Sequence, residues 1–206
     1  MAMKSEADGP SLPPPTSLAP EHLAAFDAVL RGRRTVHEFE PDRVPPREQI
    51  LAALELSTWA PNHHLTNPWR WYWLGRRTIE KVAALNARTV RETKGEELAR
   101  KKLESWLRMP GWLVLTAPVS MDEPIRHQED FAACAAAAQN LMLALWARGI
   151  ATKWSSGPIT RHPEFYELLA IDAQKEHVLG IFWYGYATQV HASRRDAPSA
   201  HVFERK

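Results

Sequence analysis

Cysteine is almost absent from the 206-residue sequence, in which Cys134 is the only one. A single cysteine excludes an internal disulfide framework. Its position inside an alanine-rich run, 132–138, indicates a buried and unreactive thiol. Residues 1–20 lack the apolar core of a signal peptide. Together these absences favour a protein of the cytoplasm.

The sequence also lacks a long hydrophobic run and a strong charge of either sign. The longest apolar stretch, around Phe131–Ala147, is rich in alanine and is interrupted by Gln139 and Asn140. It therefore indicates a buried helix and not a membrane span. The formal net charge of +2 is too small to indicate nucleic-acid binding, and no RNP, KH or zinc-finger signature is present.

Several short catalytic and nucleotide-binding motifs are missing too. No G-x-G-x-x-G and no P-loop occurs, which disfavours a Rossmann dinucleotide site and a nucleoside triphosphatase. No G-x-S-x-G elbow occurs, so the serines of the chain do not indicate a hydrolase of that type.

What remains is an ordinary globular composition, with 45% hydrophobic and 24% charged residues, on a length suited to one domain. Residues 1–20 are rich in proline and small residues and predict a flexible arm. Residues 21–206 show no internal repeat and no linker, so they predict a single domain.

Apolar periodicity predicts helices interspersed with a few strands. Helices are predicted at 21–32, 46–58, 78–107 (with a break near Gly95), 128–148 and 164–169. Strands are predicted at 69–74, 111–116, 152–155 and 177–186, with a polar surface loop at 120–127. These elements indicate an α+β fold in which helices flank a sheet. The 128–148 helix is apolar nearly all round, so it needs cover from its own sheet, from another subunit, or from both.

The first candidate binding element is Arg33-Arg34-Thr35, directly after the first predicted helix. Two guanidinium groups and a hydroxyl can hold a phosphate, because arginine offers forked donors that match phosphate oxygens. The alternative is a basic helix end that complements the helix dipole. The chemistry of these three residues alone favours the interpretation as a basic helix end over that as a phosphate site.

The second candidate is the loop 59–70, which carries Trp59, His63 and His64. Adjacent histidines suggest a metal, but no further His or Cys stands at a ligand spacing, so no metal site is predicted. The loop is either packed on the core through its aromatic residues or a platform for a planar ligand, with His63 as hydrogen-bond donor.

The third candidate follows the 152–155 strand and reads Trp154-Ser155-Ser156-Gly157-Pro158. It is either an ordinary turn after a strand or a group of amides and hydroxyls that binds a polar ring edge or a phosphate.

Taken in this order, the three elements resemble the nitroreductase family. The resemblance is carried by Arg33-Arg34-Thr35, by Ala60-Pro61-Asn62-His63 leading into Pro68-Trp69-Arg70-Trp71, and by Trp154-Ser155-Ser156-Gly157 after a long apolar helix. The loop with Ala-Pro-Asn-His is similar to a short branch of that family. The resemblance runs from about residue 22 to residue 195, and the order and spacing of the elements are more specific than any one of them.

The resemblance implies a nitroreductase-like sheet flanked by helices in an intertwined homodimer, with FMN held between the subunits. It assigns Arg33, Arg34 and Thr35 to the FMN phosphate and ribityl chain. It assigns Trp59 and His63 to the FMN of the partner subunit. It assigns Trp154, Ser155 and Ser156 to the isoalloxazine or ribityl of the same chain.

The chain departs from the family pattern at several positions. His37 stands where many relatives carry lysine or serine near the flavin pyrimidine ring, and Trp59 stands where some carry arginine. A basic residue near the C-terminus often binds the phosphate, and Arg194 and Arg195 are the candidates here, with Arg194 the one assigned.

The activity that the resemblance implies is oxidation of NADH or NADPH by FMN, followed by reduction of a small organic acceptor in a ping-pong cycle. Nitroaromatics, quinones and enones are the acceptor classes, and no catalytic side chain is assigned. The alternative is an FMN-binding carrier or sensor without turnover. A family member that dehalogenates its substrate or fragments a flavin is a third reading, without a sequence feature in its favour.

Overall fold

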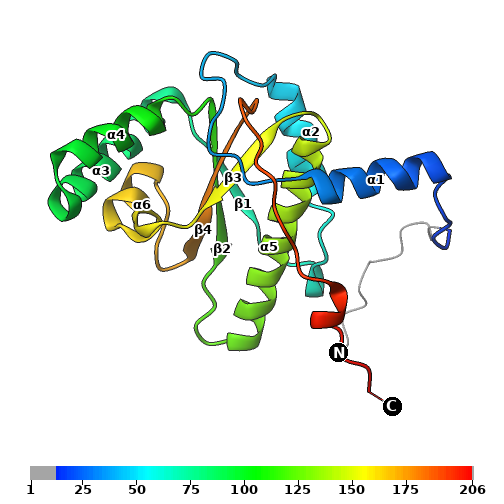
Figure 1. Ribbon diagram of the computed structural model, residues 1–206. Coiled ribbons are helices and arrows are strands. Elements are labelled where there is room, and N and C mark those ends of the chain that lie inside the picture. The colour runs from blue at the N-terminus through cyan, green and yellow to red at the C-terminus, as the bar shows by residue number, and fades with distance from the viewer. Residues whose placement is uncertain (1–12, 206) are drawn as a thin grey trace.

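The computed structural model describes residues 13–205, and the larger part of the expected N-terminal arm, residues 1–12, lies outside them. A four-stranded antiparallel sheet in the order β1-β2-β4-β3 forms the centre, with helices on both faces (Figure 1). This α+β arrangement confirms the fold class expected from the sequence. The strands are β1 (Arg70–Trp73), β2 (Gly111–Pro118), β3 (Ala151–Ser155) and β4 (Glu176–Gly185). The helices are α1 (Pro20–Gly32), α2 (Arg47–Ser57), α3 (Arg76–Lys94), α4 (Glu96–Leu107), α5 (Pro124–Trp146) and α6 (Pro163–Leu169).

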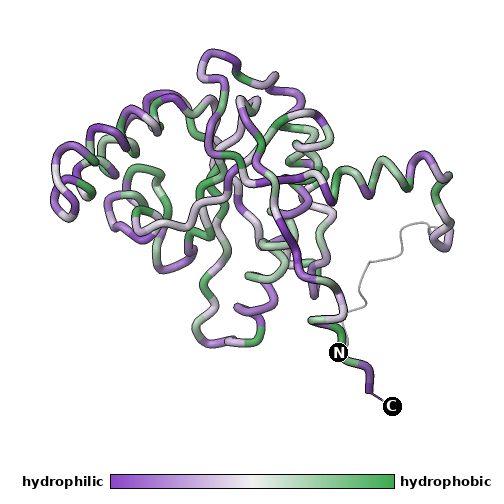
Figure 2. Tube along the Cα trace, viewed as in Figure 1, coloured by the Kyte–Doolittle hydropathy of each residue, from purple (hydrophilic) through white to green (hydrophobic). Residues whose placement is uncertain are grey.

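Both faces of the sheet are buried, because the two central strands send alternate side chains into two cores. Trp112 and Val114 of β2 face the core beneath α3, α4 and α6. Leu113 and Leu115 face the core beneath α2 and α5. The central strands are hydrophobic along most of their length, whereas α3 and α4 carry many hydrophilic residues (Figure 2).

A bulge interrupts the pairing of β2 with β4. Leu115 pairs with Gly180 and the next residue, Thr116, pairs with Val178, so β4 holds one extra residue here. The bulge reverses the alternation along β4, and Val178 and Ile181 consequently face the same core.

Helix boundaries follow local chemistry. Gly95, with φ of +89°, divides the predicted 78–107 helix into α3 and α4, because glycine adopts this conformation without steric cost. The predicted loop at 120–127 is wrong in its second half. Pro124 begins α5 there. Proline suits a first helical turn because the amide hydrogens of that turn have no acceptor within the helix, so the missing hydrogen costs nothing.

The remaining predicted elements are confirmed to within a few residues. Among residues 13–205, no helix has both the length and the apolar character needed to cross a lipid bilayer.

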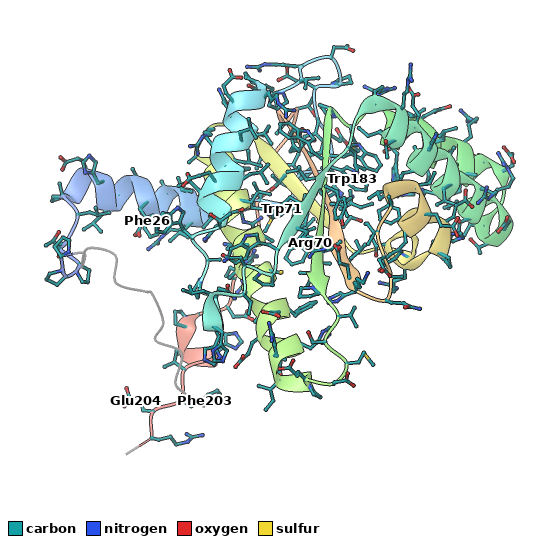
Figure 3. The ribbon with its side chains drawn as sticks, turned by 180° about the vertical axis from the view of Figure 1, so that it is seen from behind. Phe26, Arg70, Trp71, Trp183, Phe203 and Glu204 are labelled. Carbon is teal, nitrogen blue, oxygen red and sulfur yellow. The ribbon has the colours of Figure 1, made fainter. Side chains whose placement is uncertain are left out.

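Helix α1 packs little against the rest of the chain. It projects from the body of the molecule in both ribbon views (Figures 1 and 3), and none of its residues is buried. Leu23, Phe26 and Leu30 are 46%, 54% and 42% exposed. The helix thus presents an apolar surface that the described part of its own chain does not cover.

We expect Cys134 to resist thiol reagents in the folded protein. Its side chain is fully buried in α5. Burial, and after it the charge of Asp130, raises the pKa of the thiol to about 12. At pH 8 only about one thiol in 10⁴ is then the reactive thiolate. An aromatic disulfide reagent should release no chromophore from the folded chain and one equivalent after denaturation in guanidinium chloride. Equal reaction rates in the two states would contradict this.

Candidate functional site

Two of the three predicted binding elements meet at the β3 edge of the sheet. After α1, Thr35 forms a parallel bridge with Thr152, and the Val36 amide donates to the Thr152 carbonyl at 3.1 Å. This pairing holds Arg33 and Arg34 beside the start of β3, the strand that leads to Trp154 and the serines. The first and third candidate elements are thereby brought together within one chain.

Arg33 and its neighbours form a concentrated positive charge. Partial burial, then the charges of Arg195 and Arg34, lower the pKa of the Arg33 guanidinium. Within residues 13–205 neither Arg33, Arg34 nor Arg195 pairs with a carboxylate. The Arg34 side chain donates only to backbone carbonyls, those of Arg31 and Arg33. Cations gathered without counter-charges suit a bound anion, and phosphate matches guanidinium geometry well.

The two C-terminal arginines differ in their relation to this group. Arg195 is close enough to Arg33 to influence its pKa. Both residues are exposed, and the carbonyl of Arg194, the residue assigned from the resemblance, accepts from the Arg195 side chain at 2.9 Å. The structure therefore brings Arg195 to the group and does not show the Arg194 side chain there.

A second set of basic side chains adjoins the arginines. Burial, followed by the charges of Lys153 and His191, lowers the pKa of His37. Partial burial, followed by the charge of Lys102, lowers the pKa of Lys153. The Lys153 Nζ lies 4.9 Å from the centre of the Trp183 ring. The Thr152 hydroxyl oxygen is buried without a hydrogen-bond partner among the described residues. Unused donors of this kind can bind the polar atoms of a ligand.

A cavity of about 590 Å³ adjoins His37. Glu38, Phe39 and Thr188 are among its lining residues, and α4 and the turn after it contribute Lys101, Glu104, Ser105, Arg108 and Met109. The cavity leads from the surface to His37, which adjoins the arginine group.

Trp154 is held in place by β4. Its Nε1 donates to the Leu179 carbonyl at 3.2 Å, and its ring lies 5.1 Å from that of Phe182. Gly180 makes this packing possible, because a Cβ added there would lie 2.2 Å from Trp154 Nε1. Ser155 pairs with Ile181 through the backbone, and the Ser156 carbonyl accepts from Arg161. In residues 13–205 the two serine hydroxyls form no hydrogen bond, so they are available to a ligand.

Trp59 and His63 lie apart from this group. Trp59 is 74% exposed and its Nε1 donates to Glu55 at 2.9 Å. His63 Nδ1 lies 2.9 Å from a carboxylate oxygen of Glu129 in α5. No contact in the described part of the chain joins either residue to Arg33 or Trp154. One chain alone therefore assembles only part of the predicted set.

Sequence reasoning missed Lys153 and Thr152 at this site. Both residues precede Trp154 in the predicted strand 152–155, so their place at the same edge of the sheet could have been inferred from the sequence. The contact of Glu129 with the histidine loop could not have been inferred in this way, because Glu129 lies 65 positions after His64 in the chain.

Comparison with known proteins identifies the family of the chain. The model of the nitroreductase family matches residues 30–186. YfhC of Bacillus subtilis (strain 168), which carries a provisional NAD(P)H nitroreductase name, is 30% identical over 190 residues, covering 90% of this chain and 95% of that protein. The crystal structure of a nitroreductase-like family protein from Bacillus cereus is 25% identical with a TM-score of 0.76, covering 95% of this chain and all of the other.

A further solved structure is that of NfnB from Mycobacterium smegmatis, an FMN-dependent nitroreductase in complex with NADPH. It is 19% identical with a TM-score of 0.70, and covers 90% of this chain and all of the other. The family match spans most of the described residues, and the sheet order and helical layers are those of a fold shared with these structures. The chain belongs to the nitroreductase family.

Proposed function

We propose that this protein binds FMN and oxidises NADH or NADPH with reduction of a small organic acceptor. The observation that carries the proposal is the group formed by Arg33, Arg34 and Arg195, which lacks carboxylate partners within residues 13–205. These residues fit a phosphate-bearing ligand. Family membership, the NAD(P)H nitroreductase name of YfhC and the FMN and NADPH named for NfnB support the choice of ligand.

Each segment has a proposed binding role. Arg33, Arg34 and Thr35 hold the phosphate and ribityl end, and Arg195 takes the C-terminal basic role in place of Arg194. Trp154, Ser155 and Ser156 line the ring or ribityl from β3. The bound flavin supplies the hydride-transfer chemistry. The protein orients the flavin, excludes water and leaves one ring face open to NAD(P)H and afterwards to the acceptor.

The ammonium group of Lys153 offers one means of stabilising negative charge on a ligand ring edge. Burial, then the charge of Lys102, lowers the pKa of Lys153, and burial, then the charges of Lys153 and His191, lowers the pKa of His37. We propose that Lys153 supplies the positive charge that many relatives obtain from the residue at position 37.

A homodimer completes the proposed site. Trp59 and His63 lie away from the basic group of their own chain, so they would contribute to the group of a second chain. The exposed apolar residues of α1, and Phe131 of α5, which is also exposed, provide surface for the contact. The proposed acceptor is a nitroaromatic, quinone or enone, used in a ping-pong cycle in which NAD(P)+ leaves before the acceptor binds.

A visible absorbance spectrum tests the proposal. We expect the purified protein, after addition of FMN and gel filtration, to retain about one flavin per chain. Addition of NADPH or NADH under argon should bleach the bound flavin faster than free FMN at equal concentration. Subsequent addition of a quinone or nitroaromatic should restore the colour.

Two other outcomes would reject the proposal in different ways. A retained flavin that NAD(P)H does not bleach would favour the carrier or sensor alternative. A protein that retains no flavin would remove the cofactor assignment while leaving the family and the fold intact.

A further inference from the structure

A group of metal-binding side chains lies outside the basic site, where the loop before β1 meets the first half of α5. His63, His64 and Glu129 each place one potential ligand atom so that the three atoms lie within 4.8 Å of one another. His63 Nδ1 lies 2.9 Å from Glu129 Oε2, and the His63 and His64 rings stack with centres 3.8 Å apart. Two imidazoles and a carboxylate thus converge on one small volume.

The backbone of the loop explains why two adjacent histidines face the same way. His64 has φ of +61°, a left-handed conformation that is uncommon for residues other than glycine. In an extended chain neighbouring side chains would point to opposite sides, whereas this conformation stacks the His64 ring on that of His63.

Hydrogen bonds fix the loop against α5. Asn62 donates to the Thr66 hydroxyl at 2.9 Å and accepts from the Asn67 amide at 2.6 Å, and Thr66 donates to Asp130. Asp130 follows Glu129 directly in α5. The two histidines and the carboxylate are therefore held on elements that are tied to each other.

The surroundings leave room for an ion and its water. The three side chains line a cavity of about 710 Å³ together with Thr66, Glu123 and residues 124–126. Arg126, which lines the same cavity, is turned to other carboxylates and lies 3.6 Å from Glu123 and 3.8 Å from Asp130. Within residues 13–205, Glu129 has no basic partner other than His63.

We propose that His63, His64 and Glu129 bind one divalent first-row transition-metal ion, of which zinc is the representative. Imidazole nitrogen and carboxylate oxygen bind zinc at about 2.0–2.2 Å, and three protein ligands leave a fourth position for water. To bind the ion, the two stacked rings would open by rotation of their side chains so that one nitrogen of each points at the metal. Magnesium and calcium prefer an all-oxygen ligand set and do not suit two imidazoles.

The three ligands come from one chain, and although His63 is also proposed to contact the partner subunit's FMN, zinc binding does not require the flavin. His63 has two ring nitrogens, so one can coordinate the ion while the other donates a hydrogen bond. A failure of zinc binding would leave the flavin proposal unaffected, and a failure of flavin binding would leave the zinc site unaffected.

Equilibrium dialysis of the full-length, tag-free protein against zinc tests the site. We expect one tightly held zinc ion per chain, not displaced by a large excess of magnesium. His64→Asn and Glu129→Gln should each weaken zinc binding at least ten-fold, because each removes one of three ligands. Asparagine is chosen at position 64 because it tolerates the left-handed conformation.

His201→Ala serves as the matched control, since it removes an exposed histidine paired with a carboxylate, Asp196, elsewhere in the chain. It should bind zinc as the unaltered protein does. A second readout is thermal unfolding, in which zinc should raise the Tm of the unaltered protein and of the control more than that of the two site variants. Zinc affinity unchanged in both site variants, or no stoichiometric zinc in the unaltered protein, would overturn the proposal.

Discussion

Arg33→Ala is expected to weaken FMN binding by about 10- to 100-fold. Hydrogen bonds to a charged group contribute roughly 1.5–3 kcal/mol, and each 1.4 kcal/mol is a factor of about ten in Kd. Arg33 is partly buried beside Arg34 and Arg195, so the loss of its charge acts directly on the proposed phosphate. Quenching of FMN fluorescence on titration into the flavin-free protein measures the effect.

The same substitution should not destabilise the flavin-free protein. Burial, and after it repulsion from Arg195 and Arg34, lowers the pKa of Arg33, which means that its charge is unfavourable in the folded chain without an anion. The Tm of the flavin-free variant should therefore equal or exceed that of the unaltered protein, while the gain in Tm on adding FMN shrinks.

Arg100→Ala is the control for charge alone, because Arg100 forms an exposed pair with Glu104 on α4. It should leave FMN affinity unchanged. Equal FMN affinity of Arg33→Ala and Arg100→Ala would contradict the phosphate assignment.

Glu176→Ala is expected to lower the free energy of unfolding by roughly 2–4 kcal/mol. Glu176 is buried at the start of β4 and accepts hydrogen bonds from Arg70, Tyr72 and Thr116, which tie β1, β2 and β4 together. Figure 3 shows Arg70 on β1. Removing the carboxylate leaves two hydroxyls in or near the core without their acceptor, and each such loss costs about 1–3 kcal/mol. Denaturation in urea, followed by circular dichroism, measures the change.

Two variants separate burial from charge pairing in this network. Glu164→Ala removes the carboxylate that pairs with Arg88, where the two side chains are 38% and 49% exposed, far more than Glu176. Its cost should stay within about 1 kcal/mol. Tyr72→Phe removes a single hydrogen bond to Glu176 and should cost about 1 kcal/mol. Equal losses for Glu176→Ala and Glu164→Ala would show that burial of Glu176 contributes nothing.

The sequence was sufficient to predict the elements whose chemistry is local. The apolar period and the proline at its start predicted α2 to within one residue at each end, and Gly95 marked the division between α3 and α4. The start of α5 at Pro124 was missed because the polar composition of 120–127 resembles that of a loop. The bulge at Gly180 was not predictable, since it depends on how β4 pairs with a strand more than 60 residues away.

The candidate site divides in the same way. Arg33, Thr35 and Trp154 could be proposed from short motifs, and the Thr35–Thr152 bridge shows how two of those motifs meet. Arg195 could not be preferred over Arg194 from the sequence, because the C-terminal segment has no periodic structure that fixes which side chain turns inward. The approach of Glu129 to His63 likewise follows from tertiary packing alone.

The exposed helix α1 has a consequence for how the secondary structure depends on protein concentration. Isolated helices shorter than about 12–15 residues are only marginally stable in water, and most gain their stability from burial of an apolar face. α1 has 13 residues and buries none of them within its own described chain. In the proposed homodimer a second chain covers this surface, and by mass action we then expect the helicity of α1 to decrease on dilution before the sheet is affected. Because Arg33 follows directly on α1, the same dilution is expected to loosen the anchor of the arginine group.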